Sequence, residues 1–274
     1  MSSNLFPGDP SKVMVVRKVT SEITTFSVPF SRFGLLKFGG RGTLVKLRTG
    51  SLAIISPVAL TPEVQQIITS LGGKLQYIIA PDTEHHLHIT TWKRAFPDAK
   101  ILAPEGLYEK RQTSPSGAYT DSPFDHIFTA HNKHTLRISD EFHEDFNVEY
   151  IDGHSNREIV LCHKPSQTLI EADLLFNLPC VEQYTRSEES ATAGLLNRVF
   201  MPLLQARASP PTGHRRFAWY VLSKADRKSF AESVRRIYTW DFDRVIPCHG
   251  DVIEEGGKEV FRGVFEWFLG ERED

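Results

Sequence analysis

Residues 75–92, LQYIIAPDTEHHLHITTW, join an apolar run to a polar stretch that holds three histidines within four positions. The run LQYIIAP has the length and the aliphatic and aromatic content of a buried strand. His85, His86 and His88 therefore follow the carboxyl end of a predicted strand. In α/β proteins, ligands and catalytic groups gather at that end of a sheet. The stretch thus predicts both an α/β unit and a candidate site.

The segments on either side of this strand predict helices. Residues 60–73, LTPEVQQIITSLGG, place Thr61 at the N-cap, Pro62 in the first turn and two glycines at the end. Their apolar residues recur on one helical face. Residues 90–107, TTWKRAFPDAKILAPEGL, predict a helix, a turn and a further strand. The chain therefore alternates helices and strands around the histidines.

Shorter strands are expected in both halves of the chain. In the first half they are predicted at 13–16, 23–28 and 33–38, followed by a turn at 39–42 (GGRG) and a hairpin at 42–57 that turns at 48–50. In the second half they are predicted at 126–138 and 146–153, joined by a polar loop, and then in a hairpin-like unit at 157–177 and a strand and loop at 243–251. Helices are predicted at 223–240 and 256–270.

This order of elements indicates a fold class. Two β-rich halves that each end in helices predict an α/β (α+β) protein, built as an αββα sandwich. The length of 274 residues fits a single domain over residues 1–274. Residues 177–216 form an irregular insertion, expected near the rim of the site.

Composition favours a globular protein without a nucleic-acid or membrane partner. Hydrophobic residues make up 40 % and charged residues 24 %, and the formal net charge is −2. This charge gives no electrostatic reason to expect nucleic acid or an anionic membrane. No apolar run approaches the ~20 residues that span a bilayer. We expect a small-molecule substrate, and the oligomeric state stays open.

The cysteines and the N-terminus indicate a cytoplasmic location. The three cysteines, Cys162, Cys180 and Cys248, lie far apart and form no CxxC pair, which is not the pattern of a disulfide framework. The first residues, MSSNLFPGDPSK, have neither the basic start nor the apolar core of a secretory signal.

Potential metal ligands recur directly after predicted apolar strands. His85 and His86 follow LQYIIAP, His154 stands in YIDGHS, Asp173 in TLIEAD and His249 in RVIPCHGD. Strands of one sheet system would bring these loops to a common rim. Imidazole and carboxylate together suit zinc or another divalent metal. A catalytic metal keeps one position open for water and lowers the pKa of that water to about 7.

The order of these segments resembles the metallo-β-lactamase superfamily. In that family a strand leads into an HxHxDH loop, followed by a GH turn, a strand ending in Asp and a late P-x-HG loop. YIDGHSNREIVLCH is similar to the GH turn and its strand, TLIEADLLFN to the segment of the metal-bridging Asp, and RVIPCHGD to the final His loop. The resemblance extends over about residues 23–260. It implies the αββα sandwich of the metallo-β-lactamase type.

The first motif departs from the family pattern. When IIAPDTEHH is aligned with it, Pro81 and Thr83 stand at the first two histidine positions, and neither is a useful zinc ligand. His85 then takes the aspartate position and His86 the last histidine position. The resemblance therefore implies a degenerate motif and an uncharacterised branch of the superfamily. A shifted register would instead use His86 and His88 as an HxH pair.

The resemblance implies a metal site made of two sets of residues. His86, Asp173 and His249 form the main set, and His85 and His154 are the further metal ligands. Zinc is the expected cofactor, as one or two ions, with iron or manganese as alternatives.

The expected activity is metal-dependent hydrolysis of an ester, lactone, thioester or amide by metal-bound hydroxide. His85 and Asp173 are the expected catalytic residues, with His85 acting as base or ligand. One alternative is a non-catalytic binding protein with the same fold. Another is an iron-dependent redox enzyme on that fold.

Other residues near these motifs are expected to have structural roles. Cys248 is interpreted as a small buried residue beside His249. The remaining histidines are expected to be ordinary surface or loop residues: His126, His131, His134, His143, His163 and His214.

Overall fold

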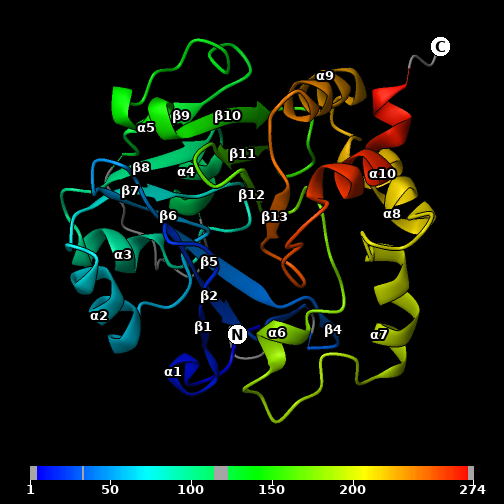
Figure 1. The fold of residues 1–274 in the computed structure, drawn as a ribbon, viewed down its shortest axis with the longest axis horizontal. Helices are drawn as coiled ribbons and strands as arrows, with labels where there is room; N and C mark the ends of the chain where they lie inside the picture. Colours follow the sequence, from blue (N-terminus) through cyan, green and yellow to red (C-terminus); the bar gives the residue numbers. More distant parts are fainter. Residues whose placement is uncertain (1–4, 33, 114–122, 271–274) are drawn as a thin grey trace.

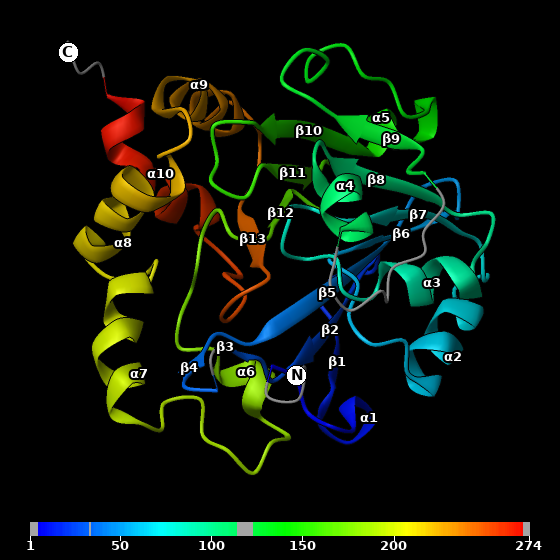
Figure 2. The same cartoon turned by 180° about the vertical axis from the view of Figure 1, so that it is seen from behind.

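The computed structural model describes residues 5–32, 34–113 and 123–270. Two β-sheets face each other, and helices cover their outer faces (Figures 1 and 2). The larger sheet has seven strands in the order β1-β2-β5-β6-β7-β8-β9, and the smaller has four in the order β10-β11-β12-β13. The α/β class and the αββα sandwich expected from the sequence are therefore confirmed.

The strands of the larger sheet are β1 (Val15–Lys18), β2 (Ile23–Val28), β5 (Gly40–Lys46), β6 (Leu52–Ile55), β7 (Leu75–Ile79), β8 (Lys100–Pro104) and β9 (His126–Phe128). Those of the smaller sheet are β10 (Phe146–Ile151), β11 (Glu158–His163), β12 (Thr168–Glu171) and β13 (Arg244–Pro247), and β3 (Ser31–Arg32) pairs with β4 (Leu36–Lys37). The α-helices are α1 (Pro10–Val13), α2 (Pro62–Ser70), α3 (Ile89–Ala95), α4 (Leu107–Gln112), α5 (Asp140–Asp145), α6 (Val181–Tyr184), α7 (Leu195–Phe200), α8 (Thr212–Phe217), α9 (Arg227–Tyr238) and α10 (Gly257–Leu269). A 3₁₀ turn, η1 (Met201–Leu204), lies in the insertion, and a π-helical turn, η2 (Ala218–Leu222), follows it after α8.

Apolar side chains fill the three spaces between these layers. Trp92 of α3 packs with the outer face of the larger sheet, and Phe230 of α9 packs with the outer face of the smaller one. Between the sheets, Ile79 of β7 and Ile170 of β12 belong to one buried cluster. Each sheet is buried on both faces, which explains why strands such as LQYII read as continuous apolar runs.

Parallel pairing in both sheets positions the site. β7 pairs in parallel with β6 and β8, and β12 pairs in parallel with β13. The loops after β7, β12 and β13 therefore leave the sheets at the same rim. The helix predicted at 60–73 is α2, and the Thr61 hydroxyl accepts a hydrogen bond from Val64 N at 3.3 Å, as its N-cap role requires.

Several local predictions were wrong. The GGRG segment is not a turn: Gly40 to Gly42 begin β5. A side chain at Gly42 would lie 3.1 Å from the Ser56 carbonyl oxygen, so glycine permits the loop after β6 to approach. The N-terminal strand begins at Val15, after helix α1. The strand expected at 33–38 is the short strand β4, and Phe33 lies outside the described residues.

The second half also differs in detail. The polar segment before β10 contains helix α5, with the Ser139 hydroxyl as its N-cap. His163 and His214 are buried rather than exposed, because they lie in strand β11 and helix α8 inside the packed layers. Within the described residues, no helix is long and apolar enough to cross a membrane.

Candidate metal centre

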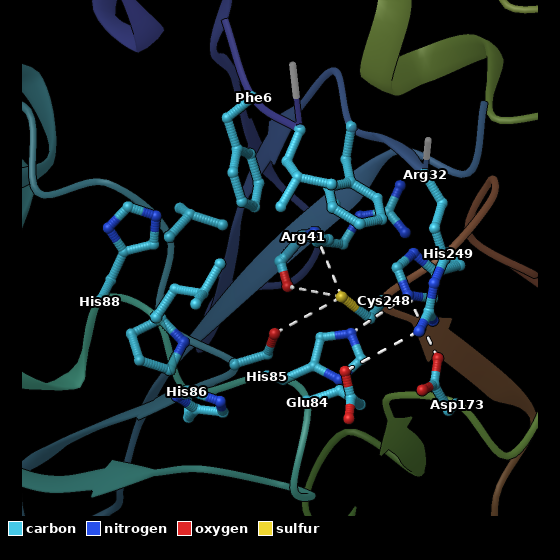
Figure 3. A pocket seen from close by; sticks show the side chains of 17 residues that line it. Phe6, Arg32, Arg41, Glu84, His85, His86, His88, Asp173, Cys248 and His249 are labelled. Atoms are coloured by element: carbon cyan, nitrogen blue, oxygen red, sulfur yellow. Dashed lines mark hydrogen bonds and ion pairs between the residues drawn. The ribbon is translucent and has the colours of Figure 1, made fainter. Parts of the chain in front are cut away.

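Three of the predicted site residues meet at the rim between the sheets (Figure 3). His85 comes from the loop after β7, Asp173 from the loop after β12 and His249 from the loop after β13. His85 Nε2 lies 3.1 Å from His249 Nε2, and His249 Nε2 lies 3.2 Å from Asp173 Oδ1. Segments that are far apart in the sequence therefore deliver two imidazoles and one carboxylate to one point.

Hydrogen bonds on the far side of each ring fix how the two imidazoles face each other. His249 Nδ1 lies 2.6 Å from the carbonyl oxygen of Gly39, which can only accept, so Nδ1 carries the proton. His85 Nδ1 lies 2.9 and 3.0 Å from the two carboxylate oxygens of Asp82, which likewise accept. In the neutral rings both Nε2 lone pairs then point at each other. A proton or a metal cation between the two Nε2 atoms would satisfy both lone pairs.

The donor distances suit a tetrahedral metal ion. Two donors bound to zinc at 2.0–2.2 Å in tetrahedral geometry lie about 3.3 Å apart. The separations of 3.1 Å between His85 and His249 and 3.2 Å between His249 and Asp173 are close to this value. A carboxylate on the outer nitrogen of a ligating histidine, as Asp82 is to His85, is a regular feature of zinc sites. The residues present therefore fit a divalent metal.

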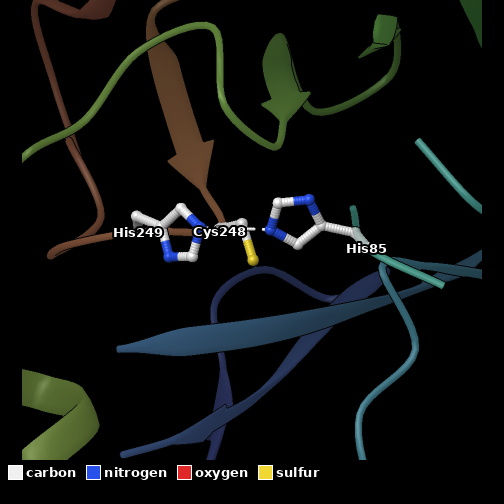
Figure 4. Close-up of side chains that lie close together, drawn as sticks. All are labelled: His85, Cys248 and His249. Atoms are coloured by element: carbon white, nitrogen blue, oxygen red, sulfur yellow. Dashed lines mark hydrogen bonds between the residues drawn. The ribbon is translucent and has the colours of Figure 1, made fainter. Parts of the chain in front are cut away.

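Cys248 adds a sulfur to the same centre (Figure 4). Donor atoms of His85, Cys248 and His249 all lie within 4.8 Å of one another, and a second such group joins Asp82, His85 and Asp173. Burial raises the pKa of the Cys248 thiol, but the neighbouring His85 and His249 bring it down to about 6. The sulfur also lies 3.4 Å from the backbone nitrogen of Arg41, which donates to it. Cys248 is buried as expected, but its thiol is also a potential metal ligand.

Electrostatics couple the carboxylate to the imidazoles. Burial alone would lower the pKa of both rings, yet Asp82 raises the pKa of His85 well above its ordinary value. The Cys248 thiol and Asp173 raise the pKa of His249. Burial would raise the pKa of Asp173, but His85 and His249 hold it far below its ordinary value. Asp173 is therefore a carboxylate, and positive charge is favoured beside it.

The structure does not bring His86 into this cluster. Its Nδ1 lies 2.9 Å from a guanidinium nitrogen of Arg111, which comes from helix α4. Burial and the Arg111 charge lower the pKa of His86 to about 4. His86 and His88 lie to one side of His85, Cys248 and His249 in Figure 3. Neighbouring residues of one loop point in different directions, so His85 takes the central place that the sequence assigned to His86.

His154 also lies outside the two donor groups. It is fully buried, its ring stacks on Phe230 with centroids 6.0 Å apart, and its Nδ1 accepts a hydrogen bond from the backbone nitrogen of Asn156. Its Nε2 lies 3.9 Å from Glu158 Oε2. Burial lowers the pKa of His154, so it remains a neutral ring behind the centre.

Comparison with known proteins places the chain in a family. Residues 36–196 match the model of a family described as a domain of unknown function (DUF4336). The chain belongs to this family. No curated protein matched the sequence.

Solved structures with the same fold include metallo-β-lactamases. A metallo-β-lactamase from Erythrobacter litoralis is similar at a TM-score of 0.58 and 13 % identity, covering 92 % of this chain and 95 % of that one. A metallo-β-lactamase from Pontibacter korlensis gives 0.55 and 13 %, covering 94 % and 100 %. The Flv1 flavodiiron core from Synechocystis gives 0.57 and 13 %, covering 94 % of this chain and 61 % of that one. This chain therefore has the metallo-β-lactamase fold, which it shares with these two metallo-β-lactamases and with a flavodiiron core.

Two carboxylates that sequence reasoning missed position the donors of this metallo-β-lactamase-fold chain. Asp82 is fully buried and holds His85. Glu158, also fully buried, accepts hydrogen bonds from the backbone nitrogens of Ala172 and Asp173 at 2.7 and 3.0 Å. The polar DTE sequence at the end of an apolar strand was the available signal for Asp82. Glu158 reads as an ordinary residue at a strand start.

Two hollows adjoin the centre. One, of about 220 Å³, is lined by His85, Asp173, Cys248 and His249 together with the N-terminal segment and the loop that carries His86 and His88. The other, of about 350 Å³, shares Asp173 and His249 and extends under the insertion. Asp173 and His249 therefore border both hollows.

Proposed function

We propose that this chain is a metal-dependent hydrolase of an ester, lactone, thioester or amide, with zinc held by His85, Asp173 and His249. The observation that carries the proposal is the convergence of the Nε2 atoms of His85 and His249 with a carboxylate oxygen of Asp173, at 3.1 and 3.2 Å. Zinc bound there would polarise a carbonyl group and lower the pKa of water. The fold supports the proposal, because proteins named as metallo-β-lactamases and as a flavodiiron core share it.

The protein groups have distinct roles in this proposal. His85 acts as a ligand rather than as a base, because its Nε2 faces His249 and its Nδ1 proton is held by Asp82. Asp173 has one oxygen at the centre, and the other accepts a hydrogen bond from the Asn156 amide at 2.6 Å. This bond orients the carboxylate, and the low pKa of Asp173 keeps it charged. Asp173 Oδ1 would therefore serve as an anionic ligand of the metal.

Metal analysis and activity of purified protein test the proposal together. We expect about one zinc per chain, a higher melting temperature on adding zinc, and hydrolysis of generic esters or lactones. The His249→Ala variant should lose bound zinc and activity, whereas His131→Ala, at an exposed loop histidine, should retain both. Activity that survives His249→Ala would refute the proposed centre.

The same measurements separate the alternatives. Zinc binding without hydrolysis across the substrate panel would identify a non-catalytic binding protein. Iron rather than zinc in the purified protein, with an absorption band in the visible range, would identify redox chemistry. Absence of bound metal together with an unchanged melting temperature on adding zinc would reject both the hydrolase and the metal site.

A further inference from the structure

We propose that the hollow under the insertion binds the apolar acyl chain of the substrate, so that the substrate class is acyl esters or thioesters of medium chain length. This inference rests on the proposed function. It follows from the lining of the hollow, its position beside the centre and its charge.

The wall of the hollow is apolar and largely aromatic. Phe38, Phe176 and Phe217 form a connected aromatic group: the ring centroids of Phe38 and Phe176 lie 5.9 Å apart, and those of Phe176 and Phe217 lie 5.8 Å apart. The other apolar residues of the lining are Phe30, Leu36, Phe200, Leu204, Val221 and Leu222. The volume of about 350 Å³ falls within the range of small-molecule sites. A wall of this kind favours a hydrocarbon group over a sugar or a peptide backbone.

The uncharged polar groups at the hollow, Ser155 and Asn156, are already engaged in the protein. The hydroxyl of Ser155 donates to the carbonyl oxygens of Val221 and Leu222, and the amide of Asn156 donates to Asp173. Away from the centre and the two cations of the lining, a ligand in the hollow therefore meets few hydrogen-bonding groups. Burial of a polar ligand there would cost free energy, since its groups would lose water without replacement.

The aromatic wall is continuous with the metal centre. The ring of His249 stacks on Phe176 with centroids 5.3 Å apart and an interplanar angle of 11°, and on Phe30 at 5.7 Å. Since His249 and Asp173 line the same hollow, a chain placed in it would have its carbonyl end at these two residues. The substrate would therefore bind with its apolar chain under the insertion and its carbonyl group at the centre.

Two cationic residues, Arg32 and Lys224, belong to the same lining. The side chain of Lys224 is exposed, and it forms no ion pair with any residue in the described parts of the chain. Asp173 is the acidic residue of the lining and lies at the centre itself. Lys224 would therefore attract the carboxylate that hydrolysis of an acyl ester releases.

The segment that follows the insertion supplies part of this wall through an unusual backbone. Val221 and Leu222 belong to the π-helical turn η2, which follows directly on α8. Turns of this type are rare and occur often at functional sites. Phe200 and Val221 are also partly exposed, at 43 % and 42 %, so they form the mouth of the hollow.

The test uses binding and hydrolysis on the zinc-loaded full chain. Calorimetric titration with acetate, butyrate, hexanoate and octanoate measures affinity without any reaction. We expect affinity to rise by roughly fourfold per added methylene, which corresponds to burial of that group. Hydrolysis of p-nitrophenyl esters with the same acyl groups should show the same trend in kcat/KM.

Two matched variants place the chain. Val221→Asp introduces a charge into the wall and should flatten the dependence on chain length. Leu195→Asp makes a comparable change at a residue of α7 that is 79 % exposed and outside the lining, and should leave the dependence unchanged. Lys224→Met should weaken octanoate binding and leave the binding of octanol unchanged.

The outcomes for the hollow and for the hydrolase are distinct. The acyl site is supported if octanoate binds more tightly than acetate and Val221→Asp removes this difference. If no ester is cleaved in the same experiments, only the proposed hydrolase activity fails. Ester cleavage with no dependence on chain length in either assay overturns the acyl site and leaves the hydrolase standing. A length dependence that Val221→Asp does not change also overturns it.

Discussion

The carboxylate of Asp82 should set the metal affinity of the centre through His85. Asp82 is fully buried, and its oxygens accept from the backbone nitrogens of Glu84 and His85 at 2.8 Å each as well as from His85 Nδ1. Asp82→Asn keeps an acceptor oxygen but removes the charge, whereas Asp82→Ala also removes the acceptor. Loss of such a partner costs about 10- to 100-fold in metal affinity, or about 1.4–2.7 kcal/mol. We expect the asparagine variant near the lower limit and the alanine variant near the upper one.

Competition between the protein and a chromogenic zinc chelator measures this effect. Glu84→Gln is the matched control, because it removes a nearby carboxylate that contacts Lys110 rather than an imidazole. Circular dichroism and thermal unfolding of the metal-free variants show whether they fold. Folded Asp82→Asn and Asp82→Ala proteins with the zinc Kd of the wild type would refute the role of Asp82 in holding His85 at the metal.

Three further predictions concern individual residues. His85→Gln should abolish high-affinity zinc binding. His86→Gln should retain it, because the His86 ring contacts Arg111 and not the centre. The reverse result in the chelator assay would identify His86 as the ligand. Cobalt-loaded wild-type protein should show no thiolate-to-cobalt charge-transfer band in the near ultraviolet, because the three proposed ligands leave the fourth position of a tetrahedral ion to water. A band that Cys248→Ser lacks and Cys162→Ala keeps would show instead that the sulfur of Cys248 binds the metal. Burial lowers the pKa of His214 to about 3, so between pH 6.5 and 4.5 the unfolded chain binds a proton that the folded chain does not. Acidification over this range should therefore lower the free energy of unfolding by about 1–3 kcal/mol more in wild type than in His214→Gln, as measured by urea denaturation. An equal decrease in the two proteins would show that His214 does not cause the loss of stability.

Periodicity and end signals in the sequence predicted much of the fold. The helix α2 was predicted from its cap, its apolar face and its terminal glycines, and β7 from its continuous apolar run. Such signals are local, so one segment is enough to show them. The prediction of a turn at GGRG was wrong because glycine is common in turns but also permits the close approach of two chain segments, as at Gly42. The choice between these meanings depends on residues that lie elsewhere in the chain.

The candidate site was predicted in its loops but only partly in its residues. Asp173 and His249 were expected at a common centre, and they meet there because β12 and β13 pair in parallel and end at the same rim. The predicted main set used His86, whereas His85 occupies the centre. Adjacent side chains of a loop diverge, and the sequence contains no information on which one points inward. Arg111 decides this, from a helix that begins about 20 residues later.

The sequence by itself determined which loops hold the potential metal ligands, because polar residues directly follow the apolar strands in these loops. Only the tertiary structure decided which donor atoms lie close enough to bind one metal ion. Pairing of Asp82 with His85, of Gly39 with His249 and of Glu158 with the backbone of Asp173 orients each donor through contacts between separate segments. Hydrogen bonds of this kind depend on distance and direction in the folded chain, and neither is encoded in the spacing of residues along it.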